Sequence, residues 1–233
     1  MKKLFIICLS LILSFGAFAQ SKVKNLQNYE DKFIHFGFSI GYNQQNFRIQ
    51  LADDFNSLTD IYGIESKAHP GFRLGPVADI RLGRFVTFRT LFYLSFNQRD
   101  LIYYLNDSAS NAFNQHTMNI SSTMLELPLQ IKFRGERYNN IAPYAIVGFC
   151  PKYDLSANKA VNDEDKPKIQ LQSFDPCGEI GGGLDLFLQY FKLSVELKYS
   201  VGFKNIIKYD DTQYSTCISS LKSSGFMLSL HFE

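Results

Sequence analysis

Residues 33–43 decide the fold, and they read Phe-Ile-His-Phe-Gly-Phe-Ser-Ile-Gly-Tyr-Asn. The even positions of this stretch, from Ile34 to Tyr42, are all apolar or aromatic, whereas the odd interior positions, from His35 to Asn43, are polar or small. Successive side chains of a β-strand point to opposite faces. The stretch therefore predicts a strand with one apolar face and one polar face.

The same alternation recurs along the chain in segments of about ten residues, which is the pattern of transmembrane β-barrels. After residues 33–43, the segments are residues 72–82, 86–97, 122–133, 141–153, 177–188, 192–203 and 226–232. The segment at 141–153 alternates less regularly than the others. The chain also contains 22 Phe and 13 Tyr, which a barrel can place against lipid and at the membrane interfaces.

The polar face of these segments separates a barrel from a soluble sandwich. A sandwich would expose long charged side chains to water on that face, but here glycines alternate with charges of both signs. A balanced set of charges is expected where side chains fill and neutralise a narrow lumen. The predicted lumen network consists of His35, Arg73, Asp79, Arg81, Arg89, Glu126, Lys132, Glu179, Asp185, Glu196, Lys198 and His231.

The fold class that follows is all-β. We expect an eight-stranded antiparallel up-and-down transmembrane β-barrel with a filled polar lumen, because eight strands leave no room for an aqueous channel.

The first residues predict export. Lys2 and Lys3 precede an apolar run, and Ala17-Phe18-Ala19 offers a signal-peptidase site. No later apolar run is long enough for a spanning helix. We therefore expect a signal peptide at residues 1–19, a periplasmic N-terminal segment at 20–32 and a barrel at 33–233 in the outer membrane of a Gram-negative bacterium.

Connection lengths predict the orientation of the barrel. Short turns follow the second, fourth and sixth segments, and long connections follow the first, third, fifth and seventh. Outer-membrane barrels have short periplasmic turns and longer external loops. This places residues 44–70, 98–119, 154–175 and 204–222 outside and both termini in the periplasm.

The sequence offers little that indicates catalysis. His35 and His231 lie in the first and last strands, which must pair, so we expect them to be neighbours within a satisfied hydrogen-bond network. No catalytic, metal-binding or cofactor-binding motif stands out, and no small-molecule substrate is indicated. A net charge of +2 without a basic patch gives no reason to expect nucleic acid as a partner. Outer-membrane lipid is the partner that the alternation implies.

Two cysteines of the mature chain share the inward parity. Cys150 and Cys177 fall at the external ends of adjacent segments, and the export signal implies an oxidising compartment. A disulfide between them would close the third long loop, while pairing of either with Cys217 is the competing arrangement.

Several motifs, taken in order, resemble the PorT family of outer-membrane β-barrels. They are residues 35–43 (HFGFSIGYN), 70–75 (PGFRLG), 79–83 (DIRLG), 126–129 (ELPL) with Lys132, Pro143-Tyr144 with Gly148, 181–185 (GGGLD), 219–223 (SSLKS) and 230–233 (LHFE). The resemblance covers nearly the whole mature chain. It implies a component of the type IX secretion system, often linked to gliding motility, with other secretion-system proteins as partners, and it implies no catalytic residues.

Three functions remain open from the sequence. The first is a secretion-machinery subunit that acts through protein contacts and not as the pore. The second is a surface binding barrel or adhesin that uses the long loops. The third and weakest is a membrane enzyme, and our prediction is that the chain is not an enzyme.

Overall fold

The computed structural model describes residues 24–52, 61–107, 112–157, 169–209 and 213–233. The expected signal peptide, the first residues of the expected N-terminal segment and the middle of each long connection lie outside these ranges. No helix in the described ranges is long and apolar enough to cross a membrane.

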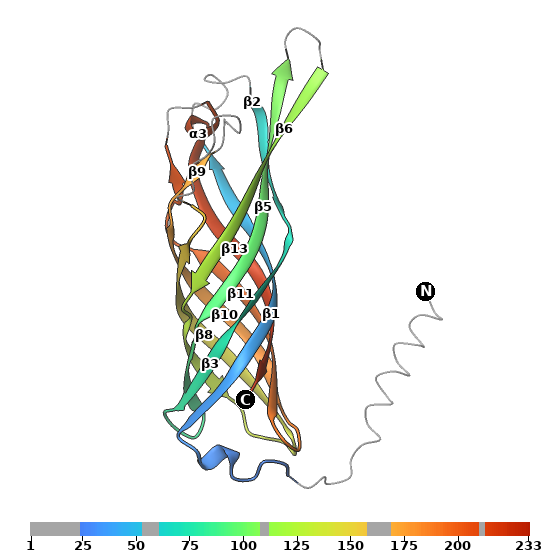
Figure 1. The fold of residues 1–233 in the computed structure, drawn as a ribbon, viewed down its shortest axis with the longest axis vertical. Coiled ribbons are helices and arrows are strands. Elements are labelled where there is room, and N and C mark those ends of the chain that lie inside the picture. Colours follow the sequence, from blue (N-terminus) through green and yellow to red (C-terminus); the bar gives the residue numbers. More distant parts are fainter. Residues whose placement is uncertain (1–23, 53–60, 108–111, 158–168, 210–212) are drawn as a thin grey trace, which may run out of the picture.

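Antiparallel strands make up nearly all of the described chain (Figure 1). The long strands are β1 (Ile34–Leu51), β2 (Ile61–Ala68), β3 (Pro70–Arg81), β4 (Val86–Leu91), β5 (Tyr93–Asp107), β6 (Ala112–Glu126), β7 (Leu129–Arg134), β8 (Ile141–Asp154), β10 (Phe174–Phe187), β11 (Lys192–Gly202) and β13 (Ile218–Phe232). The short elements are β9 (Gln170–Leu171), β12 (Ile207–Lys208), the 3-10 turn η2 (Tyr29–Asp31) and the helix α3 (Gln213–Thr216).

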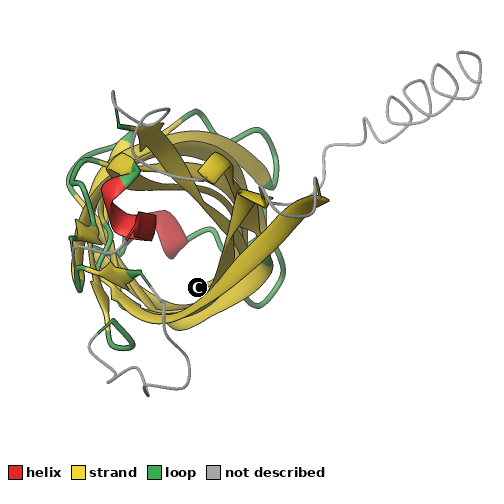
Figure 2. Ribbon diagram, turned by 90° about the horizontal axis from the view of Figure 1, so that it is seen from above, coloured by secondary structure: helices red, strands yellow, loops and turns green. Residues whose placement is uncertain are grey.

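The long strands form one closed ring, as Figure 2 shows from above. β2 and β3 together make one member of the ring, as do β4 and β5, and β6 and β7. Pairing of β1 with β13 and of β8 with β10 closes the ring at eight members. The expected eight-stranded antiparallel barrel is confirmed, and so are the short turns at residues 82–85, 135–140 and 188–191.

The interruptions within ring members occur beside prolines. The break at Phe92 lies against Pro76 of β3, where the Phe92 amide donates to the Pro76 carbonyl oxygen at 3.2 Å. The break before β7 contains Pro128, whose carbonyl oxygen accepts from the Leu91 amide. Proline has no N–H to donate to a β-ladder, so pairing shifts at these points.

The half of the barrel that contains both described chain ends, which we call the terminal half, is apolar outside. On β1, Phe36 is 75% exposed and Phe38 55% exposed. Large apolar side chains on the other strands continue this outer surface, among them Leu74, Phe133, Ile180, Leu197 and Phe226. An outward band of this kind is the lipid-facing surface of a membrane barrel.

The opposite half, which carries the long connections, reverses this arrangement, and we call it the loop half. Beyond Tyr42 the outer face of β1 becomes polar, with Gln44 and Arg48 exposed, while Phe47 is buried inside. The interior of this half is an apolar core formed by residues such as Leu101, Tyr103 and Ile218. Short segments after the long connections contribute to that core, and α3 lies over the ring in Figure 2.

Strands in the loop half replace much of what we expected to be loop. β1 runs to Leu51, and β2 occupies 61–68. β5 extends to Asp107, and β6, its partner, begins at Ala112. The sequence prediction was wrong for these parts of 44–70 and 98–119, and for the start of β13 at Ile218. The outer face of these strands is mostly polar, although Tyr62 is 74% exposed, and their apolar face points inward, so alternation with outward apolar residues does not indicate them.

Candidate functional site

The interior of the terminal half contains a cross-barrel network of ion pairs centred on Arg89. Its guanidinium group donates to both oxygens of Asp79, from Nε at 2.6 Å and from Nη2 at 2.8 Å. It also contacts Glu196 at 3.2 Å and Glu233 at 2.6 Å. Lys192 completes this layer, since its Nζ lies 2.6 Å from Glu233 and 3.7 Å from Asp79. One arginine therefore joins β3, β11 and the residue that follows β13.

Lys132 of β7 forms a second group beside this layer. Its Nζ lies 2.8 Å from Asp185 and 3.9 Å from the ring centre of Tyr144. The Tyr144 hydroxyl donates to Glu196 at 3.0 Å, which ties the group to Arg89. A Cβ on Gly183 would lie 2.6 Å from the Tyr144 ring, so glycine is required for the ring to cross the lumen there.

A third group lies nearer the loop half. Arg73 contacts Glu126 at 3.4 Å, donates to Ser229 at 2.7 Å and lies over the Tyr93 ring. Lys198 bridges Glu179 at 3.5 Å and Glu196 at 3.0 Å. Each buried carboxylate of the three groups therefore has a cation within reach, and buried charges are tolerated only in such pairs.

All predicted lumen residues except His35 and Arg81 are buried. Arg81 lies at the barrel mouth and donates from Nε to the Gly83 carbonyl oxygen at 3.3 Å. His35 is half-buried and stacks on Tyr29, with ring centres 3.9 Å apart.

The expectation that His35 and His231 are neighbours was wrong. His231 is opposite Ser39 and lies 3.2 Å from Glu196, whereas His35 is opposite Asp79. Strands of a closed barrel are staggered, so the first and last strands do not pair end to end. His35 lies four positions before Ser39, the β1 partner of His231.

Several network members were not predicted to lie in the lumen. Tyr144 lies inside, and so does the carboxylate of Glu233, which follows the last strand. Lys192 and Tyr93 are buried inside, as the inward parity of their segments predicts. Lys152 and Arg99 are buried further toward the loop half. Lys152 and Arg99 share the inward parity of their strands, so strict alternation extended through residues 99 and 152 would have identified them.

Residues 25–32 fold across the mouth at the terminal half. Tyr29 donates to Glu233 at 3.0 Å, and burial raises the pKa of its phenol, so the hydroxyl keeps its proton. Glu30 pairs with Arg134 at 2.9 Å. Arg137 donates to the Asn25 carbonyl oxygen at 2.5 Å, which ties the segment to the turn before β8.

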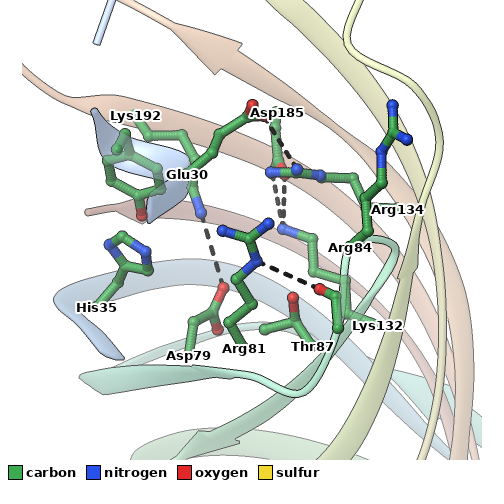
Figure 3. Close-up of a pocket in the computed structure, with 12 residues that line it drawn as sticks. Glu30, His35, Asp79, Arg81, Arg84, Thr87, Lys132, Arg134, Asp185 and Lys192 are labelled. Carbon is green, nitrogen blue, oxygen red and sulfur yellow. Dashed lines mark hydrogen bonds and ion pairs between the residues drawn. The ribbon is translucent and has the colours of Figure 1, made fainter. Parts of the chain in front are cut away.

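A small cavity of about 30 Å³ remains beside this segment, and Figure 3 shows the side chains around it. Cations outnumber anions in its wall, with Arg81, Arg84, Lys132, Arg134 and Lys192 against Glu30, Asp79 and Asp185. Most of these are already paired with one another, so the cavity extends the ion-pair network to the mouth. Within the described ranges no group of three His, Cys, Asp or Glu side chains is arranged to hold a metal ion.

Cys150 and Cys177 are directly opposite each other on β8 and β10. Both are buried free thiols, so the expected disulfide is not formed in the structure, and Cys217 is free as well. The two sulfur atoms point toward backbone carbonyl oxygens, Cys150 toward Pro151 at 3.9 Å and Cys177 toward Asp175 at 3.7 Å.

Replacing the central arginine tests whether the network holds the barrel together. Arg89→Met leaves Asp79, Glu196 and Glu233 with excess buried negative charge, and we expect it to lower the free energy of unfolding by about 3–5 kcal/mol. The matched control is Arg84→Met, because the Arg84 side chain is 77% exposed and 3.9 Å from Glu136. Its cost should stay below about 0.5 kcal/mol. Urea unfolding in lipid vesicles measures both, and equal losses would contradict the network's role.

A match to a protein family agrees with this geometry. A family model described as "Outer membrane protein beta-barrel domain" matches residues 18–208. No curated protein sequence matches the chain.

Similar solved structures include outer-membrane barrels. Neisserial surface protein A is 10% identical with a TM-score of 0.41, over 86% of this chain and 99% of that one. OprG from Pseudomonas aeruginosa is 12% identical with a TM-score of 0.43, over 84% and 93%. Ail, the attachment invasion locus protein of Yersinia pestis, is 13% identical with a TM-score of 0.38, over 84% and 96%. Likeness at this level carries no inference about function. By its family match, the chain belongs to the outer membrane protein β-barrel domain family.

Proposed function

We propose that this chain is a subunit of the type IX protein secretion machinery that acts through protein contacts, neither as the pore nor as a catalyst. The resemblance to the PorT family supports the secretion role. The filled interior supports the exclusion of a pore, and the Arg89 site is the observation that carries it. This guanidinium group is fully buried and contacts Asp79 on the neighbouring strand and, from across the lumen, Glu196 and Glu233.

A polypeptide moving through this barrel would have to break two barriers in series. In the terminal half it would separate buried ion pairs, which leaves uncompensated charge at a cost of several kcal/mol for each pair. In the loop half it would displace the apolar core around Leu101 and Ile218. The barrel is better suited to act as a rigid anchor for neighbouring proteins, in contact with outer-membrane lipid through its apolar band.

We propose further that the terminal half faces the periplasm and the loop half the outside. Short turns at the terminal half and long connections at the loop half support this orientation, as does the apolar band around the terminal half. The expected division into a signal peptide at 1–19, a periplasmic segment at 20–32 and a barrel at 33–233 belongs to the same proposal.

Cysteine labelling tests the orientation. Arg48→Cys is on the exposed outer face of the loop half, and Arg84→Cys is in a turn at the mouth. The native thiols of the described chain are buried, so they should contribute little background. A maleimide too large to cross the outer membrane should label Arg48→Cys in intact cells, and Arg84→Cys only after the membrane is permeabilised. The reverse pattern would show that the orientation is inverted.

Deletion of the gene tests the secretion role. If this chain is part of the machinery, proteins with a C-terminal signal domain should accumulate in the periplasm and disappear from the medium. The wild-type gene supplied in trans should restore their export. Quantitative proteomics of medium and periplasm measures both, and unchanged export in the deletion strain would contradict the proposal.

A surface binding barrel or adhesin is the second candidate. The apolar core of the loop half favours it, because this core fixes the strands that carry the long connections. A deletion strain with normal secretion but impaired attachment to surfaces would support this alternative over the first.

A further inference from the structure

The hairpin of β5 and β6 rises beyond the other strands of the ring (Figure 1). β6 pairs with β5 along its whole length without a register shift. On its other side it pairs with β8 only at Met124–Glu126. Within the described ranges, no strand pairs with that side of β6 above Thr123.

Strand parity identifies the backbone groups on this free edge. The Thr123 carbonyl oxygen accepts from the Leu155 amide at 2.8 Å, and the Thr123 amide donates to the Ser156 hydroxyl at 3.3 Å. Alternate residues of a strand direct their amide and carbonyl groups to the same side. The amides and carbonyls of Ser121, Asn119 and Thr117, and of Gln115 before them, therefore point away from β5.

This edge lacks the devices that keep proteins from pairing through exposed strands. Such devices are lysines and other charges, prolines and bulges. Residues 115–121 read Gln-His-Thr-Met-Asn-Ile-Ser and contain no Asp, Glu, Lys, Arg or Pro, and their register with β5 is continuous. By contrast, β2 carries Glu65 and Lys67, and the loop half of β1 carries Arg48.

We propose that this edge, residues 115–121 of β6, binds an extended segment of another protein as an added β-strand. The main-chain groups of the edge supply the ladder hydrogen bonds, and alternate side chains supply specificity. Outward, the segment meets the neutral polar groups of Thr117 and Asn119. Inward, it meets half-buried Ile120 and buried Met118 at the border of the apolar core, so it should alternate polar and apolar residues.

Membrane geometry excludes a second copy of this chain as the occupant. Antiparallel pairing of two β6 edges by a twofold axis reverses the strand direction and, with it, the barrel axis, so one copy would be upside down. Parallel pairing of the two edges requires a twofold axis along the strand. Because each strand is tilted by about 40° from its barrel axis, the two barrel axes would then be inclined to each other by about 80°. Neither arrangement fits two barrels that span the same membrane.

The inference rests on the proposed function in one respect, because it names a contact surface for a protein that acts by contacts. The two proposals still fail separately. If deletion of the chain abolishes secretion but loss of the edge leaves secretion intact, the edge proposal falls and the secretion role stands.

Hydrogen exchange of the unmodified protein is the first test. It compares residues 115–121 in native outer membranes with the same residues after purification in detergent. The amides at 115, 117, 119 and 121 should exchange roughly tenfold more slowly in native membranes. The amides at 116, 118 and 120 face β5 and should be slow in both samples, so they are an internal control. Equally fast exchange of the edge amides in both samples would overturn the proposal.

Photo-crosslinking in living cells is the second test. A photoreactive residue at Asn119 should give an adduct with a different protein, and one at Gln44, whose strand pairs on both sides, should not. Thr117→Pro removes one edge N–H without touching the β5 ladder and should reduce the adduct about fivefold or more, whereas Thr117→Val should retain it. The heat-dependent gel shift of folded barrels checks that both variants fold. An adduct confined to residues 158–168 of the same chain, or to a second copy, would overturn the proposal.

Discussion

The pairing of buried charges inside the terminal half is the constraint on which the rest of the structure depends. Arg89 and the carboxylates around it lie in a lumen surrounded by a wall of strands and then by lipid. A charge in such a place is tolerated only when an opposite charge and hydrogen bonds compensate it. Since the partners come from different strands, β3, β11 and the end of β13, the pairs also fix how the ring closes. The same pairs occupy the space that a channel would need.

The apolar face of the strands points outward in one half of the barrel and inward in the other, so the two halves are suited to different surroundings. The terminal half is apolar outside and charged inside, as lipid requires. The loop half is mostly polar outside and has an apolar core inside, which is the arrangement of a water-soluble protein. On β1 the change occurs between Tyr42 and Phe47, within a single uninterrupted strand. The level of this change marks where the membrane should end, and it explains why the strands beyond it can stay paired without lipid.

Sequence reasoning succeeded where one physical rule acted alone. Alternation against lipid gave the eight-membered ring, the short turns and the inward side chains of the terminal half, because each outward position there had to be apolar. It failed for the loop-half strands of β1, β5 and β6, where the rule is inverted and Leu101 and Tyr103 point inward. The positions of His35 and His231 depend on the stagger of the closed ring, which composition does not determine. The Tyr29 contact with Glu233 joins residues far apart in sequence, and no local pattern predicts it.

The thiols illustrate a different limit. Cys150 and Cys177 are directly opposite each other on adjacent strands and share the inward parity, as sequence spacing suggested. The structure nevertheless keeps both as free thiols. Adjacent placement is necessary for a disulfide and does not by itself require one.

Conductance of the purified full-length protein in planar lipid bilayers tests the central claim most directly, because it asks whether the lumen is filled. The ion-pair network and the apolar core in series predict a closed barrel with no stable conductance steps after insertion. Long-lived ohmic steps from inserted wild-type protein would contradict the account, since they would require an open path past Arg89.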